Sequence, residues 1–376
     1  MRKSWKCITH LLYVVPFVNI CNNRGAGVFI MSFMAVCLLF LFLYTIGRYV
    51  FSPQELIVKR CGFRMCLCVC LLTIVSLIYG IGNFYSIRFF CLFPFFILIF
   101  TRVPNIKGYI RTYFIIYLRY LVVLITCSIV IDYILMSIGL LTMQPMYSEE
   151  QYAYTTRPFG LFGQPSVNSS LLCLFYILHF TLVKRYRINY SRDWLFIVMT
   201  IGCLVQGSGS GFISYGIAFL CKYGTKNKIN ISIKRFIPYA IITVVGLVAV
   251  IMSNKVHKLS LDYINVLIEY TKDDLWYPYL QLIGSPVGLW FGMKEFPLSI
   301  DFGPLYLVGT VGLFYFIVMT IFCLTLYFRA VSAEMKLCIV LLLVGNLHYP
   351  VMFYFIMNVI WFFICYIILV IEHEKV

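Results

Sequence analysis

The sequence predicts an all-α membrane protein, a polytopic bundle of about twelve transmembrane helices. Its 376 residues are 62% hydrophobic and only 12% charged, which is too apolar for a soluble domain of this length. Apolar runs close to the bilayer-spanning length recur along the whole chain. Because these runs are continuous and do not alternate with polar residues, they favour helices over a barrel.

Each apolar run is taken as one expected span, with boundaries good to about two to four residues. In chain order the runs are 7–20, 28–46, 65–82, 87–101, 112–141, 167–183, 194–206, 211–221, 236–252, 303–328, 337–349 and 351–371. The first, seventh, eighth and eleventh are short for a full crossing. Without a linker or a clear internal repeat, residues 1–376 form one integral membrane domain with a large outer loop at 253–302.

The distribution of Lys and Arg orients the predicted spans. With the N-terminus and the C-terminus inside, 22 of the 30 basic side chains fall on the cytoplasmic side and seven fall outside, while Arg119 lies within a span. This excess is the one that the positive-inside rule requires. The net charge of +16 therefore reflects membrane topology, and no nucleic-acid partner is expected.

The outer loop 253–302 is too long for a simple connection, which indicates a function. Apolar residues recur within it at helical spacing, and the opposite face is acidic. These apolar residues are Leu261, Ile264, Leu267 and Ile268. We expect an amphipathic helix that packs on protein and not on anionic lipid. A structural lid and a substrate-binding lid fit this pattern equally well.

A glycine-rich turn, Gly207-Ser208-Gly209-Ser210-Gly211, separates two short apolar runs. A 13-residue helix such as 194–206 spans about 20 Å of a core that is roughly 30 Å thick, so the turn is expected below the outer surface. The pattern predicts a tight helical hairpin. The free N–H groups of the following helix would in addition favour an anion.

A second polar segment, 157–166, leads into the span at 167–183. Its Arg157 is expected on the outer side, away from the cytoplasmic basic clusters. Gly160 and Gly163 relax the backbone, and Pro165 suits the start of a helix. Arg157 could grip a phosphate with two parallel hydrogen bonds, or it could simply pair with a nearby acidic side chain.

The two segments together resemble Wzy-type polysaccharide polymerases and the related O-antigen ligases. Residues 157–170 are similar to the family segment in which Arg, small residues, Phe and a polar residue precede Pro and a helix. Residues 207–211 resemble the family's Ser/Gly-rich turn two spans later. Gly288-Leu289-Trp290-Phe291-Gly292, together with 301–312, is similar to the end of the family's long outer loop. The resemblance covers roughly residues 140–330 and implies a GT-C-like membrane fold.

Three departures from the family pattern bear on the site. Gln164 stands where polymerases often have Glu. Asp301 stands where ligases typically carry His, and this second departure favours a polymerase over a ligase. The long outer loop has no Arg, only Lys255, Lys258, Lys272 and Lys294. The residue that would hold a second phosphate is therefore left open.

The resemblance implies a metal-independent membrane glycosyltransferase without a cofactor, in the inner membrane of a bacterium. Its substrates would be undecaprenyl-diphosphate-linked oligosaccharides in membrane lipid, and a protein that regulates chain length is a candidate partner. Asp301 and His257 are the candidate bases. The candidate diphosphate ligands are Arg157, Arg88, Gly163, Gln164, Ser208, Ser210, Lys255, Lys258 and Lys294. The three lysines could instead be solvated loop charges, and Arg88 could be an ordinary interface anchor.

Two other classes of protein stay open. An O-antigen ligase would perform the same chemistry on another acceptor. A lipid-linked oligosaccharide flippase would suit twelve spans, but the missing repeat and the lopsided outer loop argue against it. A non-enzymatic membrane subunit is a third possibility. Arg119 and Asp132 are further candidates for a functional role, because charges inside a span are costly and rarely incidental.

Overall fold

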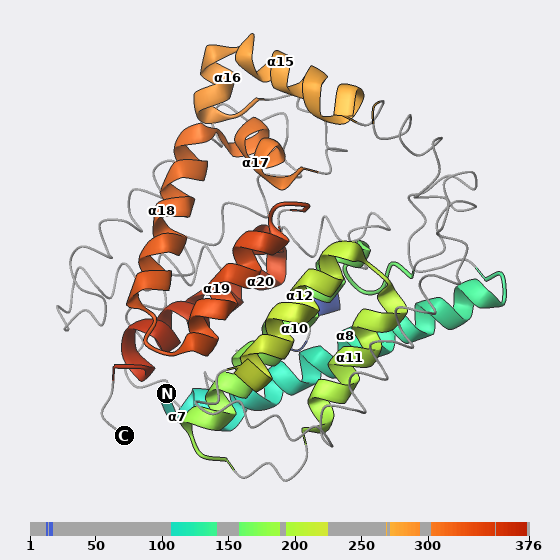
Figure 1. Cartoon of the computed structure of the whole chain (residues 1–376), viewed down its shortest axis with the longest axis vertical. Helices are drawn as coiled ribbons and strands as arrows, with labels where there is room; N and C mark the ends of the chain where they lie inside the picture. The colour runs from blue at the N-terminus through green and yellow to red at the C-terminus, as the bar shows by residue number, and fades with distance from the viewer. Residues whose placement is uncertain are drawn as a thin grey trace.

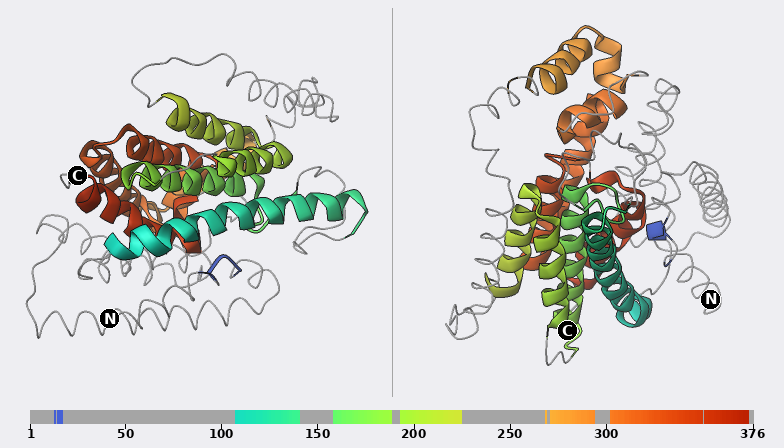
Figure 2. Two further views of the ribbon diagram at one scale, coloured as in Figure 1. Left: turned by 90° about the horizontal axis from the view of Figure 1, so that it is seen from below. Right: turned by 90° about the vertical axis from the view of Figure 1, so that its right-hand side faces the viewer.

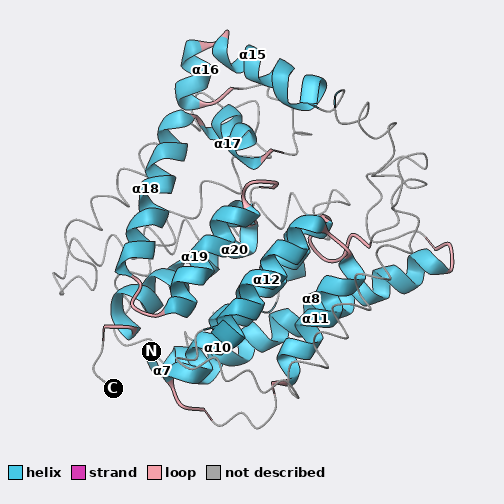
Figure 3. Ribbon diagram, in the orientation of Figure 1, coloured by secondary structure: helices cyan, strands magenta, loops and turns pink. Residues whose placement is uncertain are grey.

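The computed structural model describes residues 13, 15–17, 107–140, 158–188, 193–224, 268, 271–293, 302–349 and 351–373, and all regular structure in these ranges is helical (Figure 3). The helices in the first half are η1 (Val15–Phe17), α7 (Lys107–Tyr109), η3 (Ile110–Phe114), α8 (Ile115–Ser137), α10 (Pro165–Arg185), α11 (Trp194–Gln206) and α12 (Gly209–Gly224). Those in the second half are η5 (Thr271–Trp276), α15 (Tyr277–Ile283), α16 (Pro286–Phe291), α17 (Gly303–Val311), α18 (Leu313–Arg329), α19 (Ala333–Gly345), η6 (Val351–Phe353), α20 (Phe355–Tyr366) and η7 (Ile367–Ile371). The all-α prediction is confirmed for the described residues.

Helix α10 is the central element of the bundle. It packs against α8, α11, α12 and α19 (Figure 1). Residues 171–178 are all buried. A helix that is apolar all round is typical of the interior of a bundle. Both further views show α10 between α12 and α8 (Figure 2). The side chains around it, including Tyr176 and Trp361, form one continuous core.

Local capping signals explain where the helices beside α10 begin and end. Pro165 occupies the first position of α10, after an extended Gln164. The Asp193 side chain accepts a hydrogen bond from the Phe196 N–H at 3.2 Å and so caps α11. Gly207 ends α11 in the left-handed conformation, at φ +59°.

Most predicted spans within the described ranges correspond to helices, at 112–141, 167–183, 194–206, 211–221, 337–349 and 351–371. Two of the helical segments, Lys107–Ser137 and Pro165–Arg185, are long and apolar enough to cross a membrane by length and composition. The spans at 28–46, 65–82, 87–101 and 236–252, and most of 7–20, lie outside the described residues. The count of twelve therefore stays a prediction.

The single span predicted at 303–328 is wrong, because the chain breaks into α17 and α18 at Gly312. Gly312 adopts φ +89° and ψ 158°, a conformation open essentially to glycine alone. A Cβ on Gly312 would collide with the backbone of Trp290 and Phe291, and one on Gly292 would collide with that of Thr310. The two glycines thus let the end of α16 and the turn between α17 and α18 approach backbone to backbone. The Met293 N–H donates to the Gly309 carbonyl at 2.7 Å there.

Of the amphipathic helix predicted in the outer loop, Leu261, Ile264 and Leu267 lie outside the described residues. The segment that follows is helical through η5, α15 and α16, at the top of Figure 1. It buries Pro278 and Leu282 but leaves Trp276 54% exposed. An exposed indole suits the membrane–water boundary better than a protein interior.

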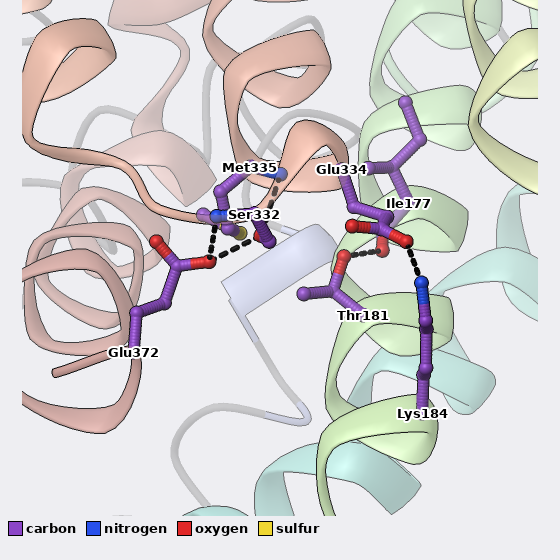
Figure 4. A network of polar contacts seen from close by, with 7 residues as sticks. All are labelled: Ile177, Thr181, Lys184, Ser332, Glu334, Met335 and Glu372. Carbon is purple, nitrogen blue, oxygen red and sulfur yellow. Dashed lines mark hydrogen bonds and ion pairs between the residues drawn. The ribbon is translucent and has the colours of Figure 1, made fainter. Parts of the chain in front are cut away.

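Basic side chains gather at one end of the bundle. Eight of the ten Lys and Arg within the described ranges lie there, all except Arg119 and Lys272. Lys184 and Glu334 form an ion pair that joins α10 to α19 (Figure 4). The Glu372 carboxylate accepts hydrogen bonds from the backbone N–H groups of Val331 and Ser332, at 2.8 and 3.0 Å. The loop 158–164 and the turn 207–208 lie at the opposite helix ends.

Candidate functional site

The loop from Pro158 to Gln164 passes into α10 and is buried at its centre. Phe159, Leu161 and Phe162 are 3%, 2% and 5% exposed. Gly160 adopts the left-handed region at φ +62°, which strains any other residue, and a Cβ there would lie only 3.0 Å from the Ile129 side chain. A buried loop needs a partner for each of its backbone polar groups.

Helix α8 supplies two of these partners. The Asp132 side chain is fully buried, and its Oδ2 accepts the N–H groups of Phe159 at 2.5 Å and of Gly160 at 3.1 Å. One turn earlier, Ser128 Oγ accepts the Leu161 N–H at 3.0 Å. Consecutive N–H groups that converge on one carboxylate oxygen form an anion nest. They also offset the cost of burying that carboxylate.

Asn168, in the first turns of α10, binds the loop from the other side. Its Oδ1 accepts the Phe162 N–H at 3.1 Å, and its Nδ2 donates to the carbonyls of Gln164, at 2.9 Å, and of Phe159. One fully buried amide therefore satisfies three backbone groups of the same loop.

Gln206, the last residue of α11, joins this loop to the glycine turn. Its Nε2 donates to the Pro158 carbonyl, and Gly207 follows it directly. The Ser208 hydroxyl is 3.2 Å from that of Ser210 and accepts the Gly211 N–H at 3.4 Å. The structure thus brings together the two segments in which the sequence analysis placed an anion site.

The end of the outer loop reaches the same end of the bundle. The Gly303 N–H donates to the Leu347 carbonyl at 3.2 Å, just beyond the end of α19. Gly345 in α19 lies beside Ser170 of α10, because a Cβ added to Gly345 would be 3.4 Å from Ser170 Oγ. The end of α19 therefore lies between the start of α17, at residue 303, and the first turns of α10.

The structure describes four of the predicted site residues. Gly163 adopts φ +72° in the loop, and Gln164 is the residue immediately before α10. Ser208 is buried in the glycine turn, and Ser210 is half-buried in the first turn of α12. The other candidates lie outside the described residues, and their roles stay predictions: Arg88, Arg157, Lys255, His257, Lys258, Lys294 and Asp301.

The two charged residues within the predicted span at 112–141 have separate partners. Arg119 Nε donates to His179 Nε2 at 3.0 Å, across the interface between α8 and α10. Asp132 binds the loop instead. Asp132 therefore holds the loop in place, and a functional role for Arg119 and Asp132 stays a prediction.

The sequence analysis did not identify Ser128, Asn168 and Gln206, which hold the loop together with Asp132. Each is a polar residue within an apolar run. For Ser128 and Asn168, this polarity was the available signal in the sequence. Gln206 had a second signal, because it stands directly before the glycine turn.

This arrangement is suited to holding one backbone loop rigidly against the N-terminal end of another helix. The hydrogen bonds come from three helices and leave little freedom for the residues between Pro158 and Gln164. A binding group carried at either end of the loop would be fixed in place before any ligand arrives. Comparison of the chain with protein-family models, with curated proteins and with solved structures finds no match.

Proposed function

We propose that the protein is a polysaccharide polymerase of the bacterial inner membrane. It transfers a growing glycan from undecaprenyl diphosphate to a sugar hydroxyl of a lipid-linked repeat unit, at the outer face of the membrane. The proposal begins from the resemblance of residues 157–170, 207–211 and 288–312 to Wzy-type polymerases. It requires these distant segments to act in one site.

One observation carries the proposal. The Gln206 side chain donates to the Pro158 carbonyl and so ties the segment that follows Arg157 to the glycine turn. The two motifs are 48 residues apart at this contact, and each alone is a weak sequence signal. Their meeting through a buried side chain is what a shared diphosphate site needs.

The proposed chemistry is a single displacement. The acceptor hydroxyl oxygen bonds to the anomeric carbon of the growing glycan, and the bond from that carbon to the diphosphate oxygen breaks. The diphosphate leaves with the electron pair, and the hydroxyl proton passes to a base, for which Asp301 and His257 are the candidates. Arg157 would stabilise the charge that develops on the diphosphate. Arg88, Lys255, Lys258 and Lys294 are candidates to assist it.

The proposed topology has about twelve spans, with both termini in the cytoplasm. The collection of eight basic side chains at one end of the bundle supports it, since cytoplasmic ends carry the excess of Lys and Arg. The loop 158–164 and the glycine turn lie at the other helix ends, which would then face outward. Lipid-linked substrates would reach that side from the outer leaflet.

The test is complementation of a strain that lacks the gene, with glycan chain length read on a gel. Arg157→Ala should leave the protein inserted but remove long chains, so that single repeat units persist. A loss of about a hundredfold or more is expected for a group that stabilises developing charge. Arg157→Lys should restore little, because an ammonium cannot form the bidentate contact. Arg187→Ala, at the basic end, is the control and should keep normal polymer.

Other outcomes select the other classes. Normal-length polymer from both Arg157→Ala and Asp301→Ala cells would overturn the site assignment. A ligase defect would leave polymer on the lipid carrier and remove it from the final acceptor. A flippase defect would trap the lipid-linked substrate on the cytoplasmic leaflet, which leaflet-resolved glycan labelling detects.

A further inference from the structure

Helices α10 and α12 begin side by side and run in the same direction. Ser170 Oγ and Ser214 Oγ lie 3.0 Å apart, and each is the sixth residue of its helix. One turn earlier on each helix, Ser166 and Ser210 should therefore lie at the same level. The positive ends of two helix dipoles meet at this point.

Near their N-termini the two helices meet through glycine and serine residues. A Cβ on Gly211 would lie 2.6 Å from both Cβ and Oγ of Ser169 and 3.2 Å from the Ser208 Cβ. The space beside Gly211 is therefore shared by two serine side chains, and the Ser210 hydroxyl is 3.2 Å from that of Ser208. Hydroxyls from both helices thus converge on the first turn of α12.

Two of the serines are buried without a hydrogen-bond partner for the hydroxyl among the described residues, Ser166 at 5% and Ser169 at 0% exposure. Their neighbour Ser170 is equally buried but is paired with Ser214. An unsatisfied buried hydroxyl is costly, so two of them at paired helix N-termini indicate a ligand that accepts hydrogen bonds.

We propose that the adjacent N-termini of α10 and α12 bind a phosphate group, through the hydroxyls of Ser166 and Ser169 and the free N–H groups of the first turn of α12. Gly209 is exposed and Ser210 half-buried, so the tip of α12 is open to a ligand. The site contains donors from neutral groups only, which suits a phosphate oxygen. The identification of that phosphate as part of a lipid diphosphate rests on the proposed function.

The experiment measures binding of inorganic pyrophosphate to the purified full-length protein in detergent, through the rise in thermal unfolding midpoint with concentration. The wild type should show a saturable rise. Ser166→Ala/Ser169→Ala should weaken the apparent affinity about tenfold or more. Ser170→Ala is the matched control, because its hydroxyl is already paired, and it should bind pyrophosphate normally.

A second pair of variants tests the site without removing a hydroxyl. Gly211→Ala places a methyl group 2.6 Å from the Ser169 Oγ, so it should displace that hydroxyl and abolish the pyrophosphate effect. Gly216→Ala lies in the same helix with open space around it and should leave binding unchanged. Both substitutions replace a glycine of α12 by alanine, so a difference in pyrophosphate binding between them reports on the contact with Ser169.

Three results would overturn the inference. One is a wild type whose midpoint does not respond to pyrophosphate, and another is an equal response in Ser166→Ala/Ser169→Ala and the wild type. The third concerns the thermal unfolding midpoint without ligand. If Ser166→Ala/Ser169→Ala lowers it as much as Ser170→Ala does, the two hydroxyls stabilise the fold and do not bind a ligand. If the double variant does not fold, the comparison of Gly211→Ala with Gly216→Ala tests the inference instead.

The source of the phosphate is separated by comparing inorganic phosphate, inorganic pyrophosphate and farnesyl diphosphate. Tighter binding of farnesyl diphosphate by tenfold or more identifies a lipid diphosphate, whereas equal binding identifies a free phosphate. These measurements need no glycan synthesis. Serine-dependent binding alongside normal-length polymer in the strain that lacks the gene would therefore overturn the proposed function and leave this site intact.

Discussion

At the scale of single residues, Asp132 shows how a buried carboxylate is accommodated inside an apolar helix. Its oxygen receives two backbone N–H groups from a loop that is 27 and 28 residues away in the chain. Each such bond to a charged group contributes about 1.5–3 kcal/mol, while an N–H left buried without a partner costs about 1–3 kcal/mol. Asp132 and the loop therefore stabilise each other.

Asp132→Ala should lower the free energy of unfolding by about 3 kcal/mol, because it strands the N–H groups of Phe159 and Gly160. Asp132→Asn keeps an acceptor oxygen and should cost about half as much. Ser137→Ala, whose hydroxyl donates only to the nearby Ile134 carbonyl on an exposed part of the same helix, should change little. Denaturant unfolding in detergent measures all three. Equal stability of Asp132→Ala and the wild type would show that the carboxylate does not hold the loop.

At the scale of elements, the end of α10 is stabilised by a Schellman motif with an unusual residue in it. The Arg187 N–H donates to the Lys184 carbonyl at 3.3 Å, and the Ile188 N–H donates to the Val183 carbonyl at 3.1 Å. Arg187 has φ +50°, the only positive φ of a non-glycine residue in the described ranges. Its Cβ makes this conformation costly, whereas glycine adopts it freely.

Arg187→Gly should therefore raise the free energy of unfolding by about 1 kcal/mol, through relief of the left-handed strain. Arg187→Ala removes the same charge but keeps a Cβ, so it separates backbone strain from electrostatics and should give no gain. The measurement is the thermal unfolding midpoint of each purified variant. A gain of the same size in both variants would assign the effect to charge instead.

At the scale of the whole molecule, side-chain contacts at the basic end join segments that are far apart in sequence. Lys184 of α10 pairs with Glu334 of α19 (Figure 4). Arg185 Nη2 donates to the Ile371 carbonyl at 2.8 Å. Glu372 receives the N–H groups at the start of α19, where it acts as an anion at a helix N-terminus. The central helix and the segment that ends at η7 are thus held together at one end.

Glu372→Ala should lower the free energy of unfolding by about 1–2 kcal/mol, a cost typical of a lost N-terminal cap. His373→Ala is its neighbour-matched control and should be neutral, because that side chain is exposed. Limited proteolysis should also cleave the η7 segment faster in Glu372→Ala than in the control. Identical unfolding and cleavage in the two variants would contradict a clamp at this end.

Features with local physical causes were predictable from the sequence. The expected run 194–206 matches α11, and 167–183 lies within α10, because apolar length, Pro165 and Gly207 are signals read from neighbouring residues. The glycine turn was predicted from the same kind of signal. The spans at 28–46, 65–82, 87–101 and 236–252, most of 7–20 and all of the candidate cations lie outside the described residues and stay predictions.

Features that depend on contacts between distant segments were decided by the tertiary structure alone. Gly312 breaks the predicted span at 303–328 at the point where the backbone of Trp290 approaches it. The residues next to Gly312 in the sequence give no signal of that contact. The roles of Asp132, Asn168 and Gln206 likewise depend on where the loop lies. Hydrophobic length and capping act within a few residues, so the sequence by itself determined the helices. A buried polar group takes whichever partner the packing brings to it, so only the folded chain decided how the candidate site is held.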